Sequence, residues 1–174
     1  MSSRRKGRIL AFQALYCREA SKAQVEELIE FSWLEDEKLE KLDPEIKVFS
    51  QALIIGALEN IHKIDDMIRA HLQNWDFSRL NRVDLAILRM SVYTLMFQKD
   101  MSPSIVIDEA IGISKEYGTD DSYRFINGVL DAIRKTLGLS LPAGIVDRRT
   151  EGNQIHRKTR QKKKADNVSC RTGK

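Results

Sequence analysis

Two stretches of the sequence combine side chains that can recognise a nucleic acid. The first is a basic cluster at the N-terminus, made of Arg4, Arg5, Lys6 and Arg8. It leads directly into an apolar run, so a packed helix would hold these charges in a defined place, which suits contacts to phosphates. The alternative is a frayed basic terminus without a ligand.

The second stretch follows Gly118 and includes Asp121, Arg124 and Phe125. An aspartate in this position is a good N-cap residue for a helix. The first turn of that helix can offer backbone N–H groups, a guanidinium and an aromatic face to a single-stranded base and its phosphate. The alternative for Phe125 is a place in the hydrophobic core.

The sequence lacks the motifs on which many catalytic sites are built. It contains neither the phosphate-binding pattern G-x-x-x-x-G-K nor the dinucleotide pattern G-x-G-x-x-G. His62, Asp65, Asp66 and His71 have the composition of a metal site, but polar side chains three residues apart are also typical of a solvated helix face. We therefore expect a binding protein rather than an enzyme, with no cofactor and no metal.

The elements that position these residues are predicted to be about seven helices. Pro44 and Pro103 each follow a residue that favours the N-cap position, and proline is well tolerated in a first helical turn. A capping box is predicted at Ser21–Gln24, and Gly118 and Gly138 are placed to end helices in a left-handed turn. No stretch alternates convincingly with period two, so we expect an all-α fold. The predicted helices lie near 4–19, 22–34, 44–58, 60–73, 79–98, 103–117 and 122–137.

The helix near 79–98 is predicted to lie at the centre of a bundle. Apolar side chains point almost all the way round it, as in a helix surrounded by others. It also carries charged residues that must reach the surface or find partners: Arg82, Asp84 and Arg89. The acidic segment 34–42 is expected to be a connection within an N-terminal bundle, and 74–78 the connection to a C-terminal bundle.

The positive charge is concentrated at the two ends of the chain. Residues 145–174 carry ten Lys or Arg and three Asp or Glu, whereas the whole chain has a net charge of +4. The segment 140–174 is predicted to be a disordered basic tail, either solubilising or able to bind polyanions nonspecifically. No run approaches the roughly 18 apolar residues that span a bilayer, and no secretory signal is recognised, so we expect a cytoplasmic protein without membrane contact.

Four segments together resemble the NusB family of bacterial transcription antitermination factors: Arg4–Tyr16, Arg82–Arg89, Pro103–Ala110 and Gly118–Asp131. The resemblance runs in order from about residue 4 to 137. It implies two helical subdomains, each built on a three-helix bundle, at about 1–74 and 75–139. It also implies binding of boxA RNA together with the ribosomal small-subunit protein NusE. That complex, with other Nus factors, keeps RNA polymerase elongating through ribosomal RNA operons.

The resemblance also implies roles for individual residues. Two groups match the family's RNA-contacting positions, the first at the arginine-rich start and the second at the beginning of the last helix: Arg4, Arg5, Lys6 and Arg8, and Asp121, Arg124 and Phe125. Tyr16 and Asp84 match positions near the NusE-binding surface, although Tyr16 lies on a helix that must also pack. The tail after Leu139 departs from the family.

Two other functions remain open. The same fold serves as an RNA-binding domain at the front of certain ribosomal RNA cytosine methyltransferases. Such an enzyme needs a cofactor-binding α/β domain after the helical one, and only a basic tail follows here. A helical adaptor without RNA affinity would share the fold and leave both basic regions unused.

Overall fold

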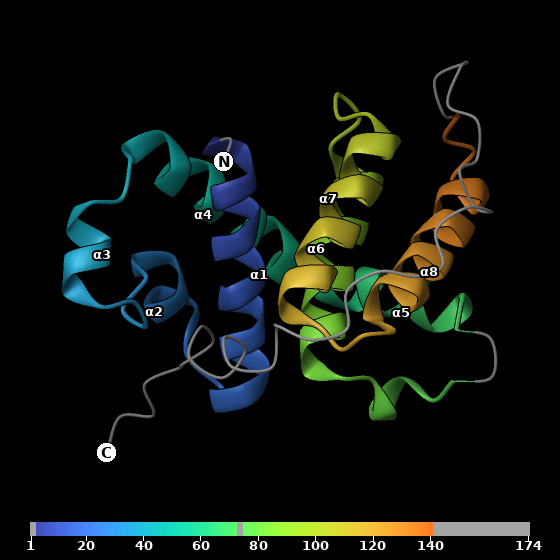
Figure 1. Ribbon diagram of the computed structural model, residues 1–174, viewed down its shortest axis with the longest axis horizontal. Coiled ribbons are helices and arrows are strands. Elements are labelled where there is room, and N and C mark those ends of the chain that lie inside the picture. Colours follow the sequence, from blue (N-terminus) through green and yellow to red (C-terminus); the bar gives the residue numbers. More distant parts are fainter. Residues whose placement is uncertain (1–2, 73–74, 141–174) are drawn as a thin grey trace.

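The computed structural model describes residues 3–72 and 75–140 and shows a helical bundle (Figure 1). The elements are α1 (Ser3–Ser21), α2 (Val25–Glu30), α3 (Asp36–Glu40), α4 (Pro44–Glu59), α5 (Ile61–Ala70), the 3-10 turn η1 (Phe77–Arg79), α6 (Arg82–Phe97), α7 (Pro103–Tyr117) and α8 (Ser122–Thr136). No strand occurs in this described part, which confirms the all-α prediction. None of the described helices is both long and apolar enough to cross a bilayer.

Helix α6 is the central element of the bundle. Every residue from Asp84 to Val92 is buried, because α6 packs against α1, α4, α5, α7 and α8. Figure 1 shows α2 and α3 at one end of the molecule and α5 and α8 at the other, with α1 and α6 between them. The prediction of a surrounded helix is therefore confirmed.

Arg89 of α6 is tied to two other helices by a buried ion cluster. Its Nε and Nη2 donate to the two carboxylate oxygens of Asp65 on α5, over 2.8 and 2.9 Å, and its Nη1 donates to Glu19 Oε1 on α1 over 2.8 Å. Burial alone would lower the pKa of Arg89, but these carboxylates outweigh burial and the pKa is raised. The cluster thus provides the partners that a buried guanidinium requires.

Two predicted helix starts are confirmed. The Asp43 side chain accepts a hydrogen bond from the Glu45 N–H over 2.8 Å, and Pro44 is the first residue of α4. Pro103 likewise opens α7, although the side chain of the N-cap residue Ser102 makes no capping hydrogen bond. These starts depend on local chemistry alone, since the cap residue and the proline lie within the first turn.

The helix predicted at 22–34 is present but shorter, as α2 (Val25–Glu30). Helix α1 continues to Ser21, and Lys22 adopts a left-handed backbone (φ 59°). Helix α2 ends at Glu30, followed by the C-cap residue Phe31, which is also left-handed (φ 60°). The N–H of Gln24 donates to Glu27 Oε2 over 2.9 Å, so the capping box lies three residues later than predicted. The segment expected to be a connection contains the additional helix α3.

Gly118 and Gly138 are required for different structural reasons. Gly138 has a φ of 67°, the left-handed conformation predicted for it. Gly118 is extended (φ −84°, ψ −172°), so the same prediction was wrong for this residue. A Cβ on Gly118 would lie 2.6 Å from Ser122 Cβ and 2.7 Å from the Ser114 carbonyl oxygen, so the close approach of α8 to α7 requires glycine.

The division into subdomains at about 1–74 and 75–139 stays a prediction. Helix α1 packs on α4 and α7 packs on α8, but α1 and α4 also pack on α6. The predicted basic tail, 140–174, lies outside the described residues except for Ser140.

Candidate nucleic-acid interface

The N-terminal basic residues occupy the first turns of α1 and differ in their exposure. Arg4 and Lys6 are exposed, Arg5 is half-buried and Arg8 is buried. This order follows from the packing of α1 on α4, where a Cβ on Gly7 would lie 2.5 Å from the Phe49 ring. The helix thus presents Arg4 and Lys6 to solvent and directs Arg8 into the bundle.

Arg5 reaches across to α7. Its Nη1 donates to Glu109 Oε2 over 3.3 Å, and its Nη2 donates to Glu116 Oε2 over 3.4 Å. The guanidinium lies against Gly112, where a Cβ would be 2.7 Å from Nη1. The side chain of Arg5 is 22% exposed, so part of it remains accessible from solvent.

Arg8 lies among side chains from three parts of the chain and is only 6% exposed. Its guanidinium carbon is 5.6 Å from the centre of the Phe49 ring, Nη1 is 4.0 Å from Glu109 Oε2, and Nη2 donates to Met101 Sδ over 3.7 Å. Burial lowers the pKa of Arg8, and the charge of Glu109 opposes that shift. In this conformation Arg8 supports the packing of α1, and its contact with RNA stays a prediction.

The second predicted patch lies at the start of α8. Asp121 and Arg124 are exposed and paired, with Arg124 Nη1 3.3 Å from Asp121 Oδ1. Asp121 occupies the N-cap position, but its side chain does not accept the capping hydrogen bond. Phe125 is half-buried against the core, and its ring lies 5.6 Å from that of Trp75, which is 61% exposed. The most accessible aromatic surface at this point therefore belongs to Trp75.

Two residues that the sequence analysis did not single out, Lys115 and Tyr123, contact each other beside the second patch. The Nζ of Lys115, near the end of α7, is 5.0 Å from the centre of the Tyr123 ring. The guanidinium of Arg124 is 5.4 Å from the same ring. The end of α7 thus contacts both other helices, α1 through the pair of Glu116 with Arg5 and α8 through the contact of Lys115 with Tyr123. Only the turn between α7 and α8 brings these groups together, so no spacing in the sequence signals them.

The predicted NusE-proximal residues are less accessible than Arg4 and Lys6. Tyr16 is half-buried and packs against the core, and Asp84 is 7% exposed in the first turn of α6. Burial raises the pKa of the Asp84 carboxyl, and a hydrogen bond from Ser122 opposes this shift only in part. The Oδ1 atom of Asp84 is buried without a hydrogen-bond partner. Such an oxygen is costly unless another group donates to it.

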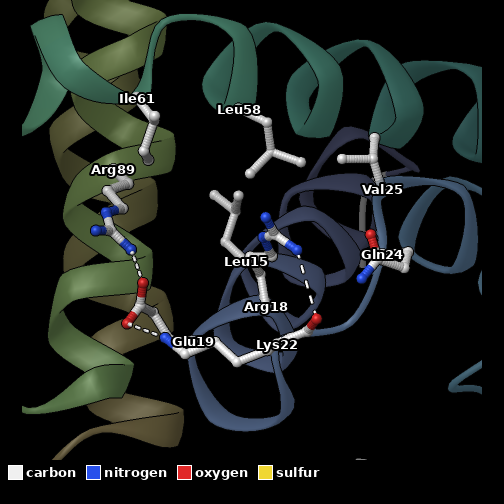
Figure 2. A pocket seen from close by; sticks show the side chains of 9 residues that line it. All are labelled: Leu15, Arg18, Glu19, Lys22, Gln24, Val25, Leu58, Ile61 and Arg89. Carbon is white, nitrogen blue, oxygen red and sulfur yellow. Dashed lines mark hydrogen bonds and ion pairs between the residues drawn. The ribbon is translucent and has the colours of Figure 1, made fainter.

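A hollow of about 540 Å³ lies at the opposite end of α1 (Figure 2). It is lined by Leu15, Arg18, Glu19, Lys22, Gln24, Val25, Leu58, Ile61 and Arg89. Figure 2 shows Glu19 between Arg89 and Lys22, while Arg18 donates to a backbone carbonyl of the same helix end. The charged groups around the hollow thus contact one another, and the hollow is separate from the basic start of α1.

The polar residues on and after α5 that resembled a metal site have other partners. Asp65 binds Arg89, and the ring of His71 lies 2.8 Å from the Met67 carbonyl oxygen and 2.7 Å from Thr136 Oγ1. Among residues 3–72 and 75–140, no group of three or more His, Cys, Asp or Glu side chains is arranged to hold a metal ion.

Comparison with known proteins identifies the family of this chain. Residues 5–135 match the NusB family. The chain is 50% identical over 131 residues to the transcription antitermination protein NusB of Treponema denticola, covering 75% of this chain and 95% of that protein. It is 48% identical over 137 residues to the NusB protein of Treponema pallidum strain Nichols, covering 76% and 93%.

Solved structures show the same fold. A NusB structure from T. maritima is 37% identical, with a TM-score of 0.67 over 78% of this chain and 92% of that one. A crystal structure of NusB and NusE in complex with double-stranded RNA has a chain that is 27% identical, with a TM-score of 0.65 over 78% and 98%. These relatives are antitermination factors and not enzymes, in agreement with the prediction for this chain. The chain belongs to the NusB family of transcription antitermination proteins.

Proposed function

We propose that this protein binds boxA RNA of ribosomal RNA operons together with the ribosomal small-subunit protein NusE. In this role it acts in the cytoplasm with other Nus factors and supports processive elongation by RNA polymerase. The observation that carries the proposal is a set of exposed basic side chains on three helices, Arg4 and Lys6 on α1, Lys115 on α7 and Arg124 on α8, with Arg5 joining α1 to α7. The solved NusB–NusE complex with double-stranded RNA supports a shared role for RNA and NusE.

The surface offers two kinds of contact to RNA. Exposed guanidinium and ammonium groups suit phosphates, which fix the register of a strand without reading its bases. The Tyr123 ring near two cations and the exposed Trp75 ring beside Phe125 suit stacked bases. We therefore assign affinity to the basic residues and base contacts to the aromatic side chains near the start of α8.

Tyr16 and Asp84 remain our candidates for contact with NusE. A half-buried tyrosine is a frequent source of binding energy at protein interfaces. The buried Oδ1 atom of Asp84 has no hydrogen-bond partner, and a donor supplied by a bound protein would satisfy it. This requirement gives the carboxylate a physical reason to lie beside an interface.

We expect the change of Arg4 or Lys6 to glutamine to weaken binding to boxA RNA and to a scrambled RNA by similar factors. Each lost phosphate contact should also reduce the slope of log affinity against log salt concentration by about 0.7. Fluorescence anisotropy at several salt concentrations measures both quantities. Lys63→Gln, at an exposed position on α5, is the matched control.

The outcome also separates the alternative functions. If the wild-type protein shows no salt-dependent RNA binding, a helical adaptor becomes the better description. If Arg4→Gln or Lys6→Gln removed the preference for boxA and left binding to scrambled RNA intact, those residues would read bases, contrary to the proposal.

A further inference from the structure

Two carboxylates on one face of α7 enclose the guanidinium of Arg5. Glu109 and Glu116 are seven residues apart, and Gly112 lies between them on the same face of the helix. Arg5 Nη1 donates to Glu109 and Nη2 donates to Glu116, over 3.3 and 3.4 Å. Each terminal nitrogen of the guanidinium is thus directed at its own anion.

Gly112 provides the space in which this guanidinium lies. A Cβ at this position would be 2.7 Å from Arg5 Nη1, 3.2 Å from Nη2 and 3.4 Å from Cζ. Three of the four heavy atoms of the guanidinium therefore lie close to Gly112 of α7. An alanine would displace the end of the arginine side chain, because 2.7 Å is closer than a Cβ can approach.

The carboxylates compete with RNA phosphates for the same donors. Both are anions that accept hydrogen bonds from a guanidinium, and a phosphate placed beside Glu109 and Glu116 would be repelled by their charges. The Arg5 and Glu109 side chains are each 22% exposed and that of Glu116 is 39% exposed, so solvent screens their attraction only in part. An RNA strand must therefore displace these carboxylates, or remain at a distance from Arg5.

We infer that Glu109, Gly112 and Glu116 form an arginine cradle that withholds Arg5 from RNA phosphates and so lowers the RNA affinity of the free protein. The inference rests on the proposed function, because it concerns the same basic surface. Helix α7 thus restrains Arg5 in addition to packing against α6 and α8. Glu109 and Glu116 act through Arg5 and need not touch the RNA.

The first test removes the carboxylates while the rest of the chain stays unchanged. We expect Glu109→Gln and Glu116→Gln each to tighten binding to both boxA and scrambled RNA about twofold to threefold, and the double variant about fivefold to tenfold. The salt slope should steepen by about 0.7, as expected for one additional phosphate contact. Glu59→Gln, at an exposed position on α4, makes the same change in net charge and should leave the affinity unchanged.

The second test moves Arg5 without altering any charge. Gly112→Ala should tighten RNA binding about twofold or more, because the new methyl group displaces the guanidinium from the cradle. Alanine also favours the helical conformation, so the melting temperature should hold or rise. When Arg5 is also changed to glutamine, we expect no further change in RNA affinity from Gly112→Ala, Glu109→Gln or Glu116→Gln, as for the control Glu59→Gln.

Two results would overturn the cradle. Weaker RNA binding by Gly112→Ala or Glu116→Gln would show that α7 presents Arg5 to the RNA instead of withholding it. Unchanged binding in all the cradle variants, with their melting temperatures intact, would show that Arg5 is not restrained. In both cases the wild-type protein still binds RNA in a salt-dependent way. Failure of the proposed function is a different result, in which the wild-type protein does not bind RNA.

Discussion

Replacing Arg89 with methionine is expected to lower the free energy of unfolding by about 3–5 kcal/mol. The change leaves the Asp65 carboxylate without the two hydrogen bonds it accepts from Arg89, and Glu19 without its shortest one. The side chains of Asp65 and Arg89 are only 11% and 9% exposed, so water cannot replace the lost partner. Urea denaturation followed by circular dichroism measures the difference.

Two further variants separate a buried ion cluster from an ordinary ion pair. Lys41→Met breaks a pair in which Lys41 Nζ lies 2.6 Å from Glu37 Oε1, but both side chains are mostly exposed, so the expected loss is at most about 1 kcal/mol. Adding Asp65→Leu to Arg89→Met should recover most of the lost stability, because no unpaired carboxylate then remains on α5. A loss below about 1 kcal/mol for Arg89→Met would contradict the structural role of the cluster.

Replacing Asp84 with asparagine is expected to stabilise the free protein and to weaken its binding to NusE. Because burial raises the pKa of Asp84, the folded protein binds a proton more readily than the unfolded chain, and the charged carboxylate opposes folding at pH 7. The stability gain should be about 1 kcal/mol at pH 7. It should disappear as the pH falls below about 3.9, where the residue is protonated in both states.

The expected loss of NusE affinity is larger than the gain in stability. Removing one partner of a buried, hydrogen-bonded charge typically costs about 2–5 kcal/mol of binding free energy, which is at least about thirtyfold in affinity. Isothermal titration calorimetry with NusE measures it. Asp108→Asn, at an exposed position on α7, is the control. Unchanged NusE affinity in Asp84→Asn would remove Asp84 from the interface and leave its burial unexplained.

The sequence predicted those parts of the fold that depend on neighbouring residues or on a long apolar pattern. The starts of α4 and α7 follow from a cap residue and a proline, and the burial of α6 follows from apolar side chains on all its faces. The region from Lys22 to Leu42 could not be predicted in the same way. There, two left-handed residues, Lys22 and Phe31, interrupt the helical pattern, and neither is a residue type that signals such a turn.

The candidate interface shows the same limit. Sequence periodicity places Arg4, Arg5, Lys6 and Arg8 on one helix, but it does not indicate that Arg8 is directed into the bundle. The pairing of Arg5 with Glu109 and Glu116 joins residues more than 100 positions apart, and the contact of Lys115 with Tyr123 depends on the turn after α7. These relations follow from tertiary packing, which no local pattern encodes.

The proposed function is tested most directly by the affinity for a labelled boxA RNA with and without saturating NusE. Fluorescence anisotropy at a single salt concentration, repeated with a scrambled RNA of equal length, provides the comparison. Bound NusE extends the small basic surface of this protein and orders it before the RNA binds. We therefore expect NusE to tighten the binding of boxA RNA by at least about fivefold, and to tighten the binding of scrambled RNA by less. Equal affinities for boxA RNA with and without NusE would contradict the proposal.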